Sequence, residues 1–216
     1  MLKCYKNKKY LYNICIMVKI KIIRHSERLD YTYPCYWLIC FGHYWSDSPL
    51  TTNGHIIAYK KGQKMLGMIN PTHIYTSPYT RTMATSTEIS TSFPKTEIVI
   101  EPLLAEYQPY YKHRINLYPH GIPTTYDGQE TEFSYPETYE KFMERVQFVV
   151  TKLIEKHDGD IILVTHGEVL KVYINYLQTM YPDLMLDPGT TPYLTSITFE
   201  FNKNTNTITQ ESIILD

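Results

Sequence analysis

Val18-Lys19-Ile20-Lys21-Ile22-Ile23 is a short apolar run that ends abruptly in Arg24-His25-Ser26-Glu27-Arg28. Such a run predicts a buried strand, and polar groups at the end of a buried strand are costly unless they find a partner. Arginine donates in a planar fork that fits phosphate or carboxylate, and imidazole can act as nucleophile, proton carrier or metal ligand. The simplest partner is an anion, although a charged loop after a strand is more often only a solvated turn.

A second histidine has the same kind of position in the chain. Asp160-Ile161-Ile162-Leu163-Val164-Thr165 is almost continuously apolar, as expected for a parallel strand covered on both faces, and it ends in His166-Gly167-Glu168. Residues 169–177 have apolar side chains at helical spacing, which places His166 where a strand passes into a helix N-terminus. Free backbone amides and the helix dipole bind anions at such positions in α/β proteins.

An arginine follows a third predicted strand. His73-Ile74-Tyr75-Thr76 is predicted as a strand that leads through a loop into a helix. Ser77 is the predicted N-cap of that helix and Pro78 its first residue, which puts Arg81 in the first turn. Taken alone, Arg81 is better explained as a solvated surface residue, because charged side chains are mostly exposed.

A carboxylate follows a fourth predicted strand. Residues 97–100 alternate like a strand, and Glu101-Pro102-Leu103-Leu104-Ala105-Glu106 comes directly after them. Glu106 is therefore expected on a loop at the end of this strand. By itself it too is better explained as surface charge.

Taken together and in this order, these segments resemble the histidine phosphatase superfamily, also called the phosphoglycerate mutase-like family. The resemblance extends from about residue 18 to the C-terminus and rests on five segments. Arg24-His25 matches the family's Arg-His-Gly signature, residues 49–54 its Pro-Leu-Thr-x-x-Gly segment, residues 77–82 its Ser-Pro-x-x-Arg segment, residues 101–106 the segment of the catalytic acid, and residues 164–167 the segment of the second histidine.

The resemblance implies an α/β fold, a three-layer α/β/α sandwich with a mostly parallel central sheet. Residues 18–216 are expected to form one histidine phosphatase domain, and residues 1–17 an N-terminal extension. The remaining pattern agrees with this fold. Thr51 or Thr52 can cap a helix, residues 136–157 carry a helical apolar stripe, and residues 195–214 are typical of a closing hairpin.

Within the superfamily, residues 24–30 together with Trp37 are most similar to the suppressor-of-T-cell-receptor-signalling type of phosphatase domain and its ecdysteroid-phosphate phosphatase relatives. That type also places an arginine where Arg28 stands. Ser26 departs from the pattern, which has glycine there. Either glycine is not required by the backbone, or the Ser26 hydroxyl contacts the phosphate.

These residue types permit a defined phosphoryl-transfer chemistry. Arg24, Arg28 and Arg81, with a protonated or hydrogen-bonding His166, would offset the charge of a phosphate dianion. His25 would attack phosphorus through a neutral ring, so a backbone carbonyl must hold the proton of its other nitrogen. Glu106 would protonate the leaving oxygen and then activate water, which requires a raised pKa that Leu103, Leu104 and Tyr107 could support by excluding water.

Metal, nucleic acid and membrane are not expected partners. Neither a His-x-x-x-His pair nor a Cys-x-x-Cys motif accompanies the site residues, and arginines repel a cation, so no metal or other cofactor is predicted. A net charge of -1 gives no reason to expect nucleic acid, and no stretch reaches the roughly 20 apolar residues of a membrane span. The four cysteines are typical of reduced thiols in a cytoplasmic protein, and a Cys35–Cys40 disulfide is the alternative. A homodimer is possible, but the sequence does not decide the oligomeric state.

The substrate is expected to be a phosphomonoester, either a small molecule or a phosphoprotein. Aromatic side chains follow the first motif and the acid, with Trp37, Tyr107 and Ser26 predicted to line the substrate site. Aromatic walls favour phosphotyrosine or another bulky ester, although 21 tyrosines could equally reflect genome composition. A phosphoglycerate mutase using Lys112, His113 and Arg114, and an inactive phospho-ligand binding module, are the alternatives to a phosphatase.

Overall fold

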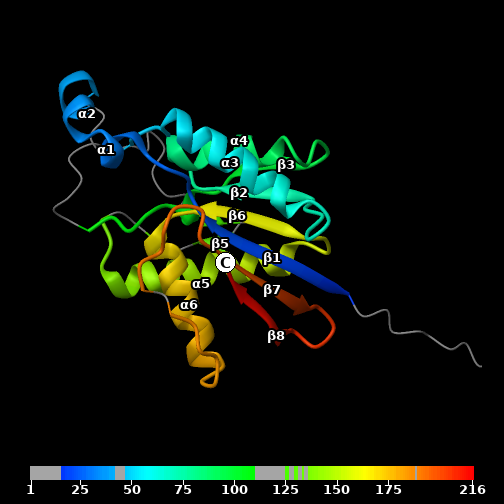
Figure 1. The fold of residues 1–216 in the computed structure, drawn as a ribbon. Helices are drawn as coiled ribbons and strands as arrows, with labels where there is room; N and C mark the ends of the chain where they lie inside the picture. The colour runs from blue at the N-terminus through cyan, green and yellow to red at the C-terminus, as the bar shows by residue number, and fades with distance from the viewer. Residues whose placement is uncertain are drawn as a thin grey trace, which may run out of the picture.

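The computed structural model describes residues 16–41, 47–109, 125–126, 129–130, 133, 136–187 and 189–216. A six-stranded sheet with the order β3-β2-β6-β1-β7-β8 forms its centre (Figure 1). The strands are β1 (Met17–Arg24), β2 (His73–Thr76), β3 (Glu97–Ile100), β6 (Ile161–Thr165), β7 (Ser196–Asn202) and β8 (Thr207–Leu215). The first four of these strands pair in parallel, and β7 and β8 are antiparallel. The predicted mostly parallel α/β sheet is therefore confirmed.

Helices cover both faces of the sheet (Figure 1). On one side lie α3 (Thr52–Met65) and α4 (Thr80–Ser90), and on the other α5 (Tyr139–Lys156) and α6 (Gly167–Met180). The smaller elements are α1 (Leu29–Thr32), α2 (Pro34–Phe41), the 3-10 helix η2 (Pro102–Leu104), and the short pair β4 (Thr125–Tyr126) and β5 (Gln129–Glu130). Within the described part of the chain, none of these helices is long and apolar enough to cross a membrane.

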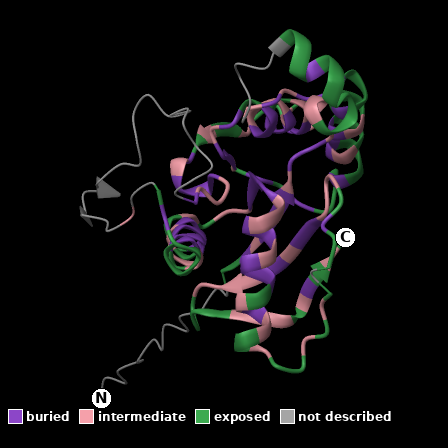
Figure 2. Cartoon of the chain, turned by 90° about the vertical axis from the view of Figure 1, so that its left-hand side faces the viewer, coloured by how far each residue is buried: buried purple, intermediate pink, exposed green. Residues whose placement is uncertain are grey.

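The alternation of side chains along β6 explains why its sequence is apolar at every position. Ile161 and Leu163 belong to the core under α5 and α6, whereas Ile162 and Val164 belong to the core under α3 and α4. A strand covered on both faces needs apolar side chains in both directions. Viewed from the side, the buried residues lie where the helices face the sheet (Figure 2).

The parallel strands end at the same edge of the sheet. Arg24 of β1 lies beside Thr165 of β6, and Thr76 of β2 lies beside Val164 and Ile100. The residues that follow these strands are therefore neighbours in space although they are far apart in sequence. This edge is where open α/β sheets bind their ligands.

The structure corrects one predicted helix start. Helix α4 begins at Thr80 with Tyr79 as its N-cap residue, so Ser77 and Pro78 lie in the loop before it. The Ser77 hydroxyl contacts His166 Nε2 at 2.8 Å instead of capping a helix. Asp47 takes over the capping role, since its carboxylate accepts hydrogen bonds from Thr80 N and Thr80 Oγ1. The prediction that Arg81 lies in the first turn is confirmed.

Other local expectations are met. Thr51 caps α3 by accepting a hydrogen bond from Gly54 N, the apolar stripe of residues 136–157 forms α5, and β7 with β8 forms the closing hairpin. Cys35 and Cys40 are exposed free thiols, so the alternative bridge between them is absent. Strand β1 begins at Met17, and residues 1–15 of the predicted extension lie outside the described residues.

Gly54 fixes the contact between α3 and the loop after β1. A Cβ atom at this position would collide with the carbonyl oxygen of Glu27. The same carbonyl accepts a hydrogen bond from Thr51 N at 3.0 Å. The glycine therefore lets the helix start approach the backbone of the loop that carries His25.

We expect Gly54→Ala to lower the free energy of unfolding by about 1–3 kcal/mol, because an atom is forced into a packed contact. Lys60→Ala is the matched control, since Lys60 is an exposed residue further along the same helix and should change stability by no more than about 0.5 kcal/mol. Urea unfolding followed by circular dichroism measures both. Equal stabilities of the two variants would contradict the packing role of Gly54.

Candidate active site

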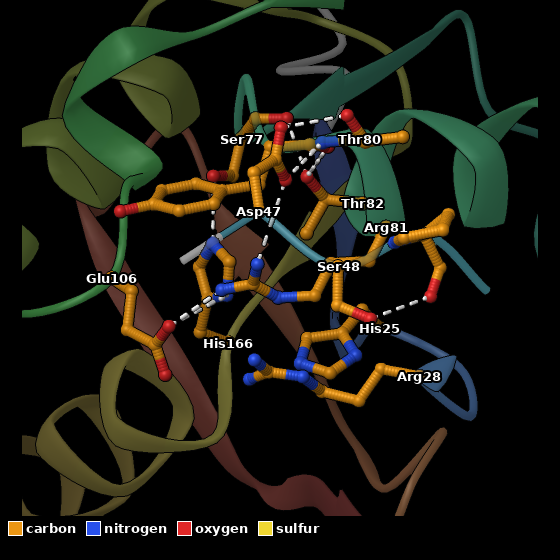
Figure 3. A network of polar contacts seen from close by, with 12 residues as sticks. His25, Arg28, Asp47, Ser48, Ser77, Thr80, Arg81, Thr82, Glu106 and His166 are labelled. Atoms are coloured by element: carbon orange, nitrogen blue, oxygen red, sulfur yellow. Dashed lines mark hydrogen bonds and ion pairs between the residues drawn. The ribbon is translucent and has the colours of Figure 1, made fainter. Parts of the chain in front are cut away.

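Four predicted residues converge beyond the ends of the parallel strands: His25, Arg81, Glu106 and His166 (Figure 3). The rings of His25 and His166 lie edge to face with centroids 5.5 Å apart. Arg81 Nη2 donates to Glu106 Oε2 at 2.5 Å and contacts His166 Nδ1 at 3.2 Å. The sheet thus brings together side chains from the loop after β1, from α4, from the loop after η2, and from the N-cap position of α6 after β6.

His25 is held as a neutral, oriented imidazole. Its side chain is buried, and burial, followed by the charge of Arg81, holds its pKa well below the usual 6.5. His25 Nδ1 lies 2.8 Å from the carbonyl oxygen of Ser26. A carbonyl can only accept, so Nδ1 carries the proton and Nε2 carries the free electron pair. This is the arrangement that the sequence analysis required of a nucleophile.

His166 is also neutral in the free protein. Burial, followed by the nearby charge of Arg81, holds its pKa well below the usual 6.5. Arginine can only donate, so the Nδ1 atom facing Arg81 accepts, and Nε2 donates to Ser77 Oγ. In the free protein, His166 therefore bridges Arg81 and Ser77 as a hydrogen-bonding imidazole.

Arg81 is the most enclosed charge of the site. It has no exposed surface, stacks over the ring of Tyr79 at 4.3 Å, and lies 3.7 Å from Asp47. The ring of Tyr79 also contacts the His166 ring, with centroids 4.9 Å apart. The sequence analysis gave no role to Asp47 or Tyr79, although Asp47 lies just before one matched segment and Tyr79 lies within another.

Arg24 and Arg28 lie on the other side of His25. Arg24 Nη1 donates to the Thr191 carbonyl, its guanidinium stacks over Tyr193 at 4.8 Å, and its buried Nε has no hydrogen-bond partner within the described residues. Arg28 donates to both oxygens of Asp30, at 2.7 and 2.5 Å, and its guanidinium points toward His25 (Figure 3). Buried donors of this kind are normally satisfied, so an unpaired one marks a place for an acceptor.

Tyr193 is a site residue that no sequence signal predicted. Its ring lies 5.9 Å from the His25 ring, and the next residue, Leu194, has a φ of 62°. Left-handed backbone is unusual for leucine and often occurs at functional sites. The Tyr193 ring, just before this turn, therefore lies near both His25 and Arg24.

Ser26, Trp37 and Tyr107 are the three residues predicted to line the substrate site. The buried Ser26 donates its hydroxyl to the carbonyl of Gly54 at 2.7 Å, so this hydroxyl is not directed at a phosphate. Trp37 is buried in α2, where it lines a cavity of about 360 Å³ together with Asp30 and Tyr31. The ring of Tyr107 packs against α5, through Tyr139 and Phe142. Gly54 thus engages the Ser26 hydroxyl, and the lining roles of these three residues stay predictions.

The three residues of the mutase alternative, Lys112, His113 and Arg114, lie outside the described residues. In the part that is described, no group of three or more His, Cys, Asp or Glu side chains could hold a metal ion. The donors gathered around His25 are arginines, and their charge suits an anion.

Comparison with known proteins supports the family assignment. The model of the histidine phosphatase superfamily (branch 1) matches residues 39–212. The chain belongs to this superfamily. An uncharacterized phosphoglycerate mutase family protein of Acanthamoeba polyphaga mimivirus is 66% identical over 201 residues, which cover 93% of this chain and 98% of the relative. The matched model begins after the Arg24-His25 motif, which the structure nevertheless places in the site.

The ecdysteroid-phosphate phosphatase type is represented among both sequences and structures. The Drosophila melanogaster ecdysteroid-phosphate phosphatase is 28% identical over 200 residues, and the match covers 70% of this chain and 26% of that protein. The Bombix mori ecdysone phosphate phosphatase in complex with tungstate has a TM-score of 0.62 at 21% identity, covering 89% and 92% of the two chains. The resemblance to this type is therefore confirmed.

Mutases have the same fold. Phosphoglycerate mutase from Bacillus anthracis has a TM-score of 0.61 at 15% identity, with 92% of this chain and 93% of the other covered. The chain is thus a phosphatase or phosphoglycerate mutase-like enzyme of the histidine phosphatase superfamily.

The two buried histidines predict a pH-dependent stability. Because their folded pKa values are depressed, the unfolded chain takes up protons below pH 6.5 where the folded chain does not. The free energy of unfolding should therefore fall as the pH drops below 6.5, by at most about 1.4 kcal/mol per pH unit for each histidine. Urea unfolding of the unmodified protein and of His25→Gln at pH 7 and pH 5.5 measures this, and the variant should lose part of the dependence. An unchanged pH dependence would contradict a neutral, buried His25.

Proposed function

We propose that the protein is a metal-independent phosphomonoester hydrolase that works through a phosphohistidine at His25. The observation that carries this proposal is a neutral imidazole, with its free Nε2 electron pair oriented by the Ser26 carbonyl, set among Arg24, Arg28 and the buried Arg81. Arginines lower the charge barrier that a phosphate dianion presents to a nucleophile. A neutral histidine is the form that can attack.

In the first chemical step, His25 Nε2 attacks phosphorus in line with the ester oxygen. The N–P bond forms as the P–O bond to the leaving group breaks, and the leaving oxygen takes a proton from Glu106. Glu106 Oε2 lies 3.8 Å from His166 Nδ1 and 2.5 Å from Arg81 Nη2, so this acid borders the place proposed for phosphate. In the second step, Glu106 takes a proton from water, and the water oxygen attacks phosphorus as the N–P bond breaks, which releases inorganic phosphate and restores neutral His25.

The environment of Glu106 differs from the expected apolar pocket. Leu103 and Leu104 belong to the core under α5 and α6, and Glu106 is about a third exposed while it pairs with Arg81. A substrate phosphate would compete with this carboxylate for Arg81. The displaced carboxyl would then be free to turn toward the leaving oxygen, so substrate binding itself would release Glu106 from its ion pair.

We further propose an aromatic or bulky ester as substrate, with phosphotyrosine as one example, and a cytoplasmic location. Tyr31 stacks against Arg28, Tyr193 against Arg24 and Tyr79 against Arg81, so each of these arginines is bordered by an aromatic ring. Such rings favour flat or apolar leaving groups. Relatives named ecdysteroid-phosphate and ecdysone phosphate phosphatases point the same way.

The deciding experiment compares two reactions of the purified protein. We expect turnover of 4-nitrophenyl phosphate and phosphotyrosine, and no conversion of 3-phosphoglycerate in the presence of its bisphosphate primer. His25→Ala should lose at least about 1,000-fold in kcat/KM, since nothing else in the site replaces the nucleophile. His55→Ala is the matched control, because His55 is an exposed histidine on α3, and it should keep full activity.

Each other result would exclude the proposal. Conversion of 3-phosphoglycerate without ester hydrolysis would identify a mutase, and phosphate binding without any turnover would identify a binding module. An acid-labile phosphoprotein, trapped by rapid quenching and absent from His25→Ala, is expected from the phosphohistidine pathway. Full activity of His25→Ala would assign the nucleophile elsewhere.

A further inference from the structure

A buried ion pair outside the catalytic residues joins α5 to the loop that carries Glu106. Arg145 has no exposed surface, and Glu137, which lies just before α5, is 8% exposed. Arg145 Nε donates to Glu137 Oε2 at 2.9 Å, and Arg145 Nη2 donates to Glu137 Oε1 at 2.6 Å. A buried pair of this kind is often no more stabilising than apolar side chains of similar size, so stability alone does not explain it.

The same two side chains bind the backbone on both sides of Glu106. Arg145 Nη1 donates to the carbonyls of Leu103 at 2.5 Å and Ala105 at 3.1 Å. On the other side, Glu137 Oε1 accepts from Gln108 N at 3.3 Å, and Glu137 N donates to the Gln108 carbonyl at 3.1 Å. Glu106 therefore lies between two segments that are tied to one ion pair.

The loop is also tied to the phosphate side of the site. Gln108 Nε2 donates to Tyr79 Oη at 3.0 Å, and the Tyr79 ring contacts both Arg81 and His166. Residues 105–109 form neither helix nor strand, so regular backbone hydrogen bonds do not set the position of Glu106. These tertiary contacts are what place the carboxylate relative to His25.

We propose that the Arg145–Glu137 pair is a positioning device for the catalytic acid, an inference that rests on the proposed role of Glu106. Proton transfer to a leaving oxygen requires hydrogen-bond geometry, and a misplacement of about 1 Å can cost on the order of 100-fold in rate. Loss of the pair should therefore lower the rate most for esters whose leaving group must be protonated, and least for esters whose leaving group departs without a proton. The phosphate-binding arginines and His25 stay in place.

The test uses Arg145→Lys and Glu137→Gln, measured with 4-nitrophenyl phosphate and with an alkyl phosphate. The 4-nitrophenolate is stable enough to leave without a proton, whereas an alkoxide must be protonated as it leaves. We expect kcat/KM for the alkyl ester to fall by on the order of 100-fold and kcat/KM for the nitrophenyl ester by less than about threefold. The ratio kcat/KM is the right quantity, because it reports the steps up to formation of the phosphohistidine and excludes its hydrolysis.

Two further variants separate positioning from a general structural role. Val149→Ala removes apolar packing one turn further along α5, where Val149 is buried in the core, and should change both esters equally or not at all. Glu106→Gln should show the same selective loss as Glu137→Gln. The double variant Glu106→Gln with Glu137→Gln should be no slower than Glu106→Gln alone, because residues that act through one group are not additive.

The outcomes can be told apart from failure of the proposed function. If the unmodified protein hydrolyses neither ester, the proposed function itself is wrong. If it hydrolyses both esters but Arg145→Lys and Glu137→Gln lose both activities equally, the positioning role is overturned. The positioning role is also overturned if the loss caused by Glu137→Gln adds to the loss caused by Glu106→Gln. Glu137→Gln keeps the shape of the side chain and one acceptor oxygen, so it tests the proposal even if Arg145→Lys does not fold.

Discussion

The organisation of the site follows from one buried charge, the guanidinium of Arg81. An arginine does not lose its proton in a protein, and removing its charge from water costs several kcal/mol unless other groups compensate. Glu106 and Asp47 supply negative charge, and Tyr79 supplies the face of an aromatic ring. The same charge, added to burial, keeps His25 and His166 neutral. A single desolvated cation thus produces both a nucleophile in its reactive form and a site that attracts an anion.

Much of this arrangement can be predicted from sequence because its parts are local. The continuous apolar pattern of β6 follows from burial on both faces, and the residues after each parallel strand must meet at one edge. What could not be predicted depends on contacts between distant segments. The start of α4 shifts because Asp47, more than 30 residues away, caps it while Ser77 binds His166. From the sequence alone, Arg145 is one polar residue of an amphipathic helix. Its role depends on contacts with Glu137 and with the carbonyl of Ala105, which only the structure shows.

Ser26 shows how a departure from a family pattern is accommodated. A glycine would be required here only if the backbone had a positive φ, and the φ of Ser26 is not positive. Its hydroxyl bonds the carbonyl of Gly54, and its amide donates to Thr85 Oγ1 at 3.0 Å. The serine therefore connects the nucleophile loop to both helices of one layer, α3 and α4. It leaves the Ser26 carbonyl free to orient His25, which is the contact that the chemistry needs.

The charges around His25 also constrain how a substrate can bind. Asp30 holds Arg28 at both oxygens, and Glu106 and Asp47 lie against Arg81, whereas Arg24 contacts the Thr191 carbonyl and the Tyr193 ring. Arg24 therefore keeps more of its charge for an anion than the other two arginines do. On the proposed mechanism, a phosphate reaches Arg81 Nη2 by displacing the Glu106 carboxylate, and it then lies beside His166 Nδ1, which contacts the same nitrogen. One anion thus replaces another at Arg81, so the charge of the buried guanidinium stays compensated while the carboxyl of Glu106 is released toward the leaving group.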